Sequence, residues 1–195
     1  MNTFFTSDAH LFDNRFKQLF RPFDSTEQYV KTIRDNWNSV VGENDVVYCV
    51  GDILYDESRM SILNTFNGKK HLIRGNHEKL NDSEYLKYFS SVQNHTVITM
   101  TSNDKAERFY VNHYPTKGSL KMYNIVGHVH GAWKVQKNMI NVSVDCWNYT
   151  PVSSSQIVRM VEAIEKYYDE DVWAAYSEIN TKYMYRGKDG SYSDN

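Results

Sequence analysis

Short apolar runs recur along the chain, and most are followed at once by Gly, Asp, Asn or His. This pattern is typical of short buried strands that end in tight loops. Between the first three runs, apolar residues return at three- and four-residue spacing, which indicates helices. The runs that we interpret as strands cover residues 4–5, 46–50, 72–73, 109–111 and 125–126.

The clearest predicted helix covers residues 25–41. Ser25 and Gln28 match a capping box, and an apolar stripe continues to Val41 before Gly42. Two weaker helices are predicted over residues 58–66 and 82–89. Because strands and helices alternate here, we expect parallel strand pairing in the first half of the chain.

The second half has a different pattern. Residues 97–100 and 108–112 flank a polar turn and predict an antiparallel hairpin. Ser153 and Gln156 open a final amphipathic helix. Further short strands are predicted over residues 123–126, 133–136 and 139–144. Together the two halves predict an α/β (α+β) fold that contains mixed sheets.

The chain of 195 residues has no internal repeat and no linker-like segment. We therefore predict one domain over residues 1–168 and a C-terminal extension over residues 169–195, partly helical and then frayed.

Charge and composition exclude several classes of protein. Twenty-two basic residues against 24 acidic ones disfavour nucleic acid as a partner. The two cysteines lie far apart, and no apolar stretch is long enough for a membrane span, so we expect neither a disulfide scaffold nor a membrane protein. The N-terminus does not resemble a signal peptide, so we expect a cytoplasmic location. Oligomeric state has no signal in the sequence.

Five polar motifs follow predicted strands, and they contain five of the seven histidines. Open α/β sheets bind ligands at the carboxyl ends of their strands, so motifs in these places are candidates for one site. The motifs are Asp8-Ala9-His10, Gly51-Asp52, Gly75-Asn76-His77-Glu78, His113 and Gly127-His128-Val129-His130.

These residue types suit the hydrolysis of a phosphate ester. Two metal ions about 3.5–4 Å apart can activate a hydroxide and neutralise the phosphoryl oxygens. Such a pair needs an anionic ligand between the ions, and Asp52 is the natural candidate. Imidazole and carboxylate donors suit manganese, iron, zinc or cobalt better than calcium, and no cysteine belongs to the motifs.

The ordered set resembles the calcineurin-like metallophosphoesterase superfamily, whose motifs DxH, GD, GNH[D/E], H and GHxH occur in this order. The flanking residues resemble a small single-domain branch found in bacteria and phages, and the resemblance covers about residues 3 to 165. It implies a four-layer αββα sandwich in which two mixed sheets are flanked by helices. It also implies a site with two divalent metal ions, for which manganese is favoured and iron, zinc, cobalt or magnesium are alternatives.

The resemblance also implies individual roles. His77 would stabilise the transition state and protonate the leaving oxygen, Glu78 would orient His77, and a hydroxide between the metals would be the nucleophile. The implied ligands are Asp8, His10 and His130 for the first metal, Asn76, His113 and His128 for the second, and Asp52 as the bridge.

One departure affects the expected substrate. The protein phosphatases of the superfamily carry an arginine shortly after the GD motif, whereas residues 51–57 here contain none and end in acidic residues. This disfavours a protein phosphatase. The remaining candidates for phosphate-binding cations are Arg15, Arg21, Arg74 and Lys117, although packing or an ion pair is an equal alternative for Arg74.

The predicted function is a metal-dependent phosphoesterase that acts on a small phosphate ester, with a phosphodiester or nucleotide favoured. The acidic loop and the missing arginine favour a monoanionic diester over a dianionic monoester. The alternatives are a phosphomonoesterase, a non-catalytic interaction scaffold of the same fold, and a protein in which the metal is purely structural.

Overall fold

The computed structural model describes residues 1–15, 21–102, 105–136 and 138–167. The chain divides into two compact units, Met1–Glu162 and Ala163–Asn195. The second unit is described only over residues 163–167, so the predicted extension over residues 169–195 lies outside the described residues, and the domain boundary stays a prediction.

The first sheet is built largely from the first half of the chain. In its order β10-β1-β2-β3-β4, the four strands β1 to β4 run parallel and β10 pairs antiparallel with β1. The parallel pairing predicted from the strand and helix alternation is therefore confirmed. The bounds are β1 (Thr3–Thr6), β2 (Val46–Val50), β3 (Lys69–Ile73), β4 (Ser91–Gln93) and β10 (Val152–Ser153).

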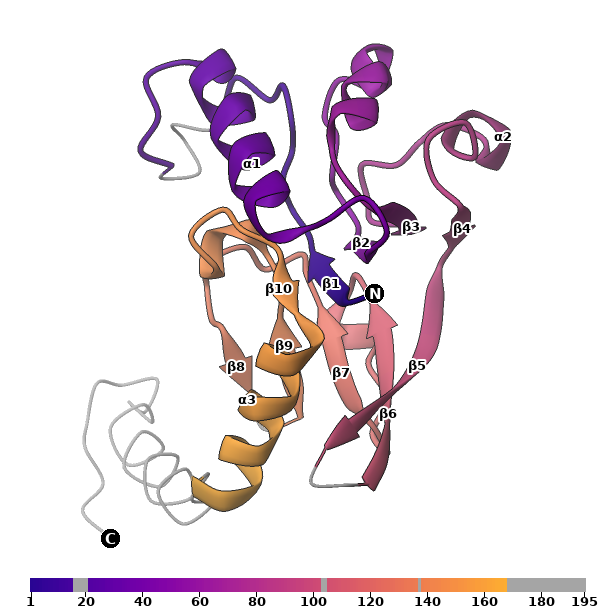
Figure 1. The fold of residues 1–195 in the computed structure, drawn as a ribbon, viewed down its shortest axis with the longest axis vertical. Coiled ribbons are helices and arrows are strands. Elements are labelled where there is room, and N and C mark those ends of the chain that lie inside the picture. Colours follow the sequence, from indigo (N-terminus) through magenta and orange to yellow (C-terminus); the bar gives the residue numbers. More distant parts are fainter. Residues whose placement is uncertain (16–20, 103–104, 137, 168–195) are drawn as a thin grey trace, which may run out of the picture. The chain divides into compact units, whose positions relative to one another are not determined.

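Helical segments cover one face of this sheet, and the second sheet lies on the other side (Figure 1). They are α1 (Thr26–Val40), the 3₁₀ segment η1 (Glu57–Thr65) and the short α2 (Asp82–Tyr85). The predicted apolar stripe of α1 packs with the sheet in one core cluster, where Ile33 and Trp37 meet Val47. Burial of this stripe stabilises the contact between α1 and the sheet.

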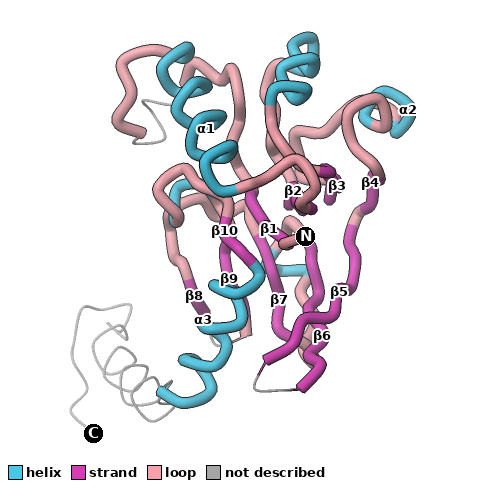
Figure 2. Tube along the Cα trace, viewed as in Figure 1, coloured by secondary structure: helices cyan, strands magenta, loops and turns pink. Residues whose placement is uncertain are grey.

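The second sheet has the order β5-β6-β7-β9-β8. The predicted hairpin forms the antiparallel pair β5 and β6, while β6, β7 and β9 run parallel. Figure 2 shows these strands in magenta. The bounds are β5 (His95–Ser102), β6 (Lys105–Asn112), β7 (Tyr123–Val126), β8 (Val135–Gln136) and β9 (Met139–Asn141).

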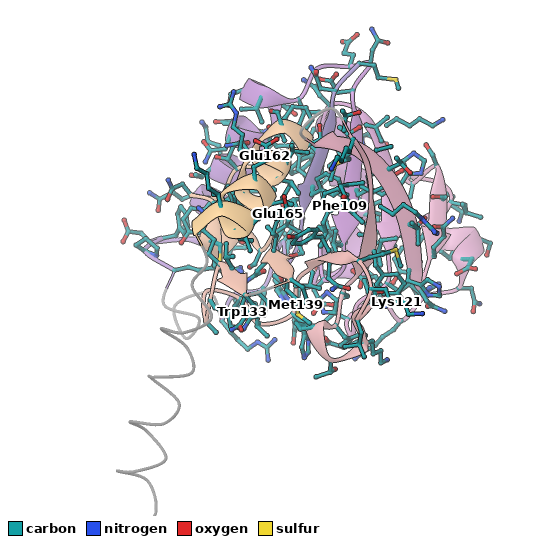
Figure 3. All side chains as sticks on the ribbon, turned by 90° about the horizontal axis from the view of Figure 1, so that it is seen from below. Phe109, Lys121, Trp133, Met139, Glu162 and Glu165 are labelled. Carbon is teal, nitrogen blue, oxygen red and sulfur yellow. The ribbon has the colours of Figure 1, made fainter. Side chains whose placement is uncertain are left out.

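A second apolar cluster joins the two sheets. Phe5 and Ile73 from the first sheet pack with Ile125 and Ile140 from the second. Phe109 of β6 is fully buried in the same cluster and lies in the interior of the view in Figure 3. The two mixed sheets and their helices confirm the predicted mixed α/β sandwich.

The final helix, α3 (Ser154–Tyr167), begins with the predicted capping box. Ser153 Oγ accepts a hydrogen bond from the Gln156 backbone amide, and Gln156 Oε1 accepts one from the Ser153 amide. Ile157 and Val161 bury the first half of the helix in the cluster between the sheets.

Several predicted bounds differ from the structure. Strand β9 ends at Asn141, and two short 3₁₀ segments, η2 (Pro115–Lys117) and η3 (Val144–Cys146), lie in loops. The predicted helix over residues 82–89 has only four α-helical residues. In the part of the chain that is described, no helix is long and apolar enough to cross a membrane.

Candidate metal centre

The five sequence motifs meet at one end of the two sheets. Backbone hydrogen bonds tie their loops together: the Asp8 amide donates to Gly51 O, His10 to Asp52 O, and Gly127 to His113 O. These loops follow β1, β2, β3, β6 and β7, whose carboxyl ends therefore position the motifs.

The backbone of these loops is unusual. Five of the eight described non-glycine residues with positive φ are predicted ligands, although side chains generally disfavour this region. Strained backbone of this kind persists only where the surrounding structure holds it, and it concentrates at functional sites. The five are Asp8 (56°), His10 (44°), Asp52 (55°), His128 (74°) and His130 (50°).

A first donor group consists of Asp8, His10 and His130, whose ligand atoms all lie within 4.8 Å of one another. His10 is buried, and neither ring nitrogen has a hydrogen-bond partner within the described part of the chain. Burial lowers the pKa of His10 to about 3, so its ring is neutral and can donate a lone pair to a metal. Asp8 is fully buried and accepts hydrogen bonds from Ser7 Oγ at 2.6 Å and from the His128 amide.

A second donor group consists of Asp52, His113 and His128, which also lie within 4.8 Å. Asn76 Oδ1 joins them, 3.2 Å from His113 Nε2 and 3.0 Å from His128 Nδ1. The two ring nitrogens face each other at 3.2 Å. Nitrogen and oxygen atoms that converge in this way are suited to a shared cation.

Asp52 lies between the two groups. Its Oδ2 is 3.7 Å from His10 Nε2 and 3.5 Å from His113 Nε2, and its Oδ1 accepts the His77 amide at 2.9 Å. Burial alone would raise the pKa of Asp52, but the hydrogen bond and charge of His113 outweigh it and bring this pKa to about 2. The carboxylate is therefore ionised at neutral pH.

Two of the histidines are oriented by partners outside the donor groups. His113 Nδ1 lies 2.8 Å from Val50 O, and His130 Nδ1 lies 2.9 Å from Asp145 Oδ2. When such a ring is neutral, donation of the Nδ1 proton leaves the Nε2 lone pair available for a cation.

Asp145 is a candidate site residue that the sequence analysis did not single out. Arg21 holds it with two hydrogen bonds of 2.8 and 2.9 Å, and the Arg21 side chain is almost fully buried. Burial raises the pKa of Asp145, but the hydrogen bonds from His130 and Arg21 outweigh this and bring the pKa to about 2. The signal in the sequence that could have identified Asp145 was its position directly after the predicted strand over residues 139–144.

His77 lies beside the first donor group. Its ring centroid is 4.8 Å from that of His10 and 5.6 Å from that of Tyr55. Its ligand atom also lies within 4.8 Å of those of His10 and Asp52, so geometry alone permits either an acid or a ligand.

Glu78 contacts different groups from those predicted. Its carboxylate accepts the backbone amides of Asp52, Ile53 and Gly75, and no hydrogen bond to the His77 ring is present among the described residues. Glu78 therefore fixes the Asp52 loop to the Gly75 loop, and its role in orienting His77 stays a prediction. Burial, together with the charge of Asp52, raises the pKa of Glu78 to about 7.

Two of the four candidate cations have structural contacts instead of an open position. Arg21 is buried and donates to Asp145, the carbonyls of Asp8 and Ala9, and Tyr29. Arg74 donates to the carbonyls of Glu78 and Leu80 and pairs with Asp82. Both are therefore better explained as residues that hold loops in place.

The other two cations lie at the margins of the centre. The Arg15 side chain is about half exposed, pairs with Asp13 and lies over the Tyr55 ring at 4.5 Å. Lys117 Nζ lies 4.3 Å from the centroid of Tyr114, whose ring is 4.9 Å from His113. Both remain candidates for contact with a substrate.

The residues present fit divalent metal ions. Buried carboxylates, imidazole nitrogens and an amide oxygen converge, and the ring nitrogens of the buried His10 have no hydrogen-bond partner among the described residues. Buried polar atoms are nearly always satisfied, so unpartnered ones at a cluster of donors indicate a bound ion.

The fold and this cluster define a two-sheet α/β protein with a candidate metal centre on the loops at one end of its sheets. The sequence profile of the calcineurin-like phosphoesterases matches residues 1–175, and the chain belongs to this family.

Individual relatives are similar over different lengths. The chain is 31% identical over 165 residues to an uncharacterized protein of Methanocaldococcus jannaschii, covering 80% of this chain and 89% of that one. It is 35% identical over 82 residues to the gene 66 protein of a Mycobacterium phage, covering 40% of each. A protein of unknown function from Aquifex aeolicus has the same fold, with a TM-score of 0.64, 21% identity, and coverage of 82% of this chain and 98% of that one.

Proposed function

We propose that this chain hydrolyses a phosphodiester with the help of two divalent metal ions, of which manganese is favoured. The observation that carries the proposal is the position of Asp52 Oδ2, within 3.7 Å of His10 Nε2 and 3.5 Å of His113 Nε2. One carboxylate oxygen thus joins two donor groups, as a pair of neighbouring cations requires.

The two donor groups support the division of ligands that the family resemblance implies. Asp8, His10 and His130 would hold one ion, Asn76, His113 and His128 the other, and Asp52 both. When bound, such a pair lowers the pKa of an attacking water and neutralises charge on the phosphoryl oxygens.

His77 is the candidate general acid. The attacking water first loses one proton to solvent, and as the bond from its oxygen to phosphorus forms, the bond from phosphorus to the leaving oxygen breaks. The leaving oxygen keeps the electron pair and takes a proton from the His77 ring. Tyr55 contacts this ring and Arg15 lies over Tyr55, so both line the approach on this side.

The charge of the site supports a diester over a monoester. Arg21 and Arg74 both donate hydrogen bonds to carboxylates and backbone carbonyls. The candidate cations that remain for a substrate are Arg15 and Lys117, at the margins of the centre. A dianionic monoester gains more than a monoanionic diester from an arginine clamp, so a site without one favours the diester.

The test compares a chromogenic phosphodiester with its monoester on chelator-stripped protein, with and without added Mn²⁺. We expect Mn²⁺ to restore hydrolysis and the diester to react faster. Asp52→Asn should abolish turnover while the fold is kept, measured by circular dichroism. A faster monoester would support a phosphatase, and a folded, metal-loaded protein that is inactive on both would support the scaffold alternative.

A further inference from the structure

A pocket of about 430 Å³ opens beside the second donor group. Its volume lies within the range of about 300–1,000 Å³ that is common for small-molecule sites. Gly75 of its wall directly precedes Asn76, and Asn112 directly precedes His113. We name it the Tyr110 pocket. The residues that line it include Arg74, Asn94, Tyr110, Asn112, Tyr114 and Lys117.

Aromatic rings form two of its walls. Tyr110 stacks on His95 with a centroid distance of 5.2 Å and an interplanar angle of 30°. The Tyr114 ring lies 4.9 Å from His113 and 5.0 Å from His128, so it connects the pocket with the metal ligands. Aromatic side chains of this kind bind planar ring systems by stacking, and all nucleobases have such a face.

The polar groups of the pocket fall into two sets. Asn112 and Arg74 are engaged: Asn112 Oδ1 accepts the Tyr114 amide at 2.8 Å, and Arg74 donates to loop carbonyls and Asp82. The side-chain amide of Asn94 has no hydrogen bond within the described residues, and Lys117 has no carboxylate partner there. The side-chain amide of Asn94 is thus available for a hydrogen bond with the edge of a nucleobase, and Lys117 is available for an anionic group.

The pocket and His77 lie next to different donor groups. His77 contacts His10 of the first group, whereas Tyr114 contacts His113 and His128 of the second. A phosphodiester bound at the metal centre carries two organic groups. One of them can lie in the Tyr110 pocket and the other beside His77.

We propose that the Tyr110 pocket binds the nucleoside of a nucleotide phosphodiester, the part that stays on phosphorus when the other ester bond breaks. This inference rests on the proposed function and adds the substrate class. The base lies against Tyr110 and Tyr114, Lys117 faces the phosphate, and the leaving oxygen lies on the His77 side. The product is a nucleoside monophosphate.

The kinetic test compares thymidine 5′-(4-nitrophenyl phosphate) with methyl 4-nitrophenyl phosphate on Mn²⁺-loaded protein. We expect kcat/KM to favour the thymidine ester, and Tyr110→Ala to reduce this preference by about tenfold, in line with the loss of one stacking contact. Tyr110→Phe keeps the ring and should keep the preference. Lys117→Ala should lower kcat/KM for both esters, because both carry the phosphate that Lys117 faces. Lys69→Ala, at an exposed lysine at the start of β3, is the matched control and should leave kcat/KM unchanged.

A binding measurement separates this inference from the proposed function. Calorimetry with thymidine 5′-monophosphate, ribose 5-phosphate and methyl phosphate should show the tightest binding for the nucleotide, and Tyr110→Ala should remove that difference. If calorimetry gives this result but the protein hydrolyses none of the esters, the pocket is supported and the proposed function is overturned. An active protein with an unchanged ester preference in Tyr110→Ala, or with equal binding of ribose 5-phosphate, would overturn the pocket alone.

Discussion

At the residue scale, the centre depends on side chains that do not themselves face a metal. Arg21 and Asp145 form a buried chain of hydrogen bonds that ends at His130 Nδ1. Such partners fix the tautomer and the direction of the ligating nitrogen. From the sequence, Arg21 was one of four candidates for binding phosphate, because a motif shows which residues are charged but does not show which charges are neutralised by burial with a partner.

Asp145→Asn should weaken binding at the first donor group. The amide keeps the shape but leaves His130 without its anionic acceptor, and loss of such a partner typically costs about 10–100-fold in metal affinity. Calorimetric titration of chelator-stripped protein with Mn²⁺ measures this. Asp24→Asn, at an exposed position before α1, should leave the affinity unchanged. Equal affinity in wild type and Asp145→Asn would contradict the orienting role.

Asp145 should also make the metal-free protein acid-sensitive. Its pKa is about 2 in the folded protein against an ordinary value of 3.8, so its ionised form favours folding. This contribution, ~2 kcal/mol, is present above pH 4 and is lost as the pH falls towards 2. Urea unfolding at pH 5, 3.5 and 2.5 should therefore show a smaller loss of unfolding free energy in Asp145→Asn than in wild type. Parallel curves for the two proteins would show that the ion pair does not contribute.

His77→Asn distinguishes a general acid from a metal ligand. As an acid, His77 contributes about 10²–10⁴-fold to the rate, most strongly for a poor leaving group. We expect a large loss of kcat with an alkyl ester, a small one with a 4-nitrophenyl ester, and an unchanged metal content measured by elemental analysis. Loss of one metal ion per chain would make His77 a ligand instead.

At the scale of elements, the loops that hold the ligands depend on close backbone approach. Gly51 has φ of +85°, and a Cβ added there would lie 2.9 Å from Gly75 Cα and overlap the His113 ring. The Asp52 loop, the Gly75 loop and His113 therefore occupy positions that fit only around a glycine.

Gly51→Ala should displace His113 and weaken the second donor group. We expect lower Mn²⁺ affinity and a loss of stability of about 1–3 kcal/mol from backbone strain. Gly131→Ala is the matched control, because its Cβ would lie 3.6 Å from the Asp145 Cβ, an ordinary contact. Chemical unfolding and Mn²⁺ titration check both variants, and equal behaviour of the two would contradict the argument.

Strong periodic elements could be predicted from the sequence, and weak ones could not. Residues 46–50 were predicted with the bounds of β2, and Ser25 and Ser153 cap the helices that they were expected to open. The three-residue β4 and two-residue β10 were missed, because runs this short have no period and form only through pairing with β3 and β1. The motif residues were found because each follows a strand, but the partners of Glu78 depend on how two loops meet in space.

At the scale of the whole molecule, most of the apolar core of Met1–Glu162 comes from residues outside the five ligand motifs. One cluster lies between the first sheet and its helices and the other between the two sheets, and both consist of buried apolar residues. The ligands lie on the loops at the strand ends. The apolar burial that stabilises the sheets therefore does not require an ion.

Metal removal should accordingly cost activity before structure. Ligand binding stabilises the folded state by mass action, about 2.7 kcal/mol per site when the free ion is at a hundred times its Kd. Chelator-stripped protein should keep its far-ultraviolet circular dichroism spectrum and unfold cooperatively, with a Tm that rises as Mn²⁺ is added. A protein in which the metal is purely structural would instead lose its spectrum on chelation. If the stripped protein unfolds at 25 °C, the two apolar clusters are insufficient without the ions, and the donor loops are part of what stabilises the fold.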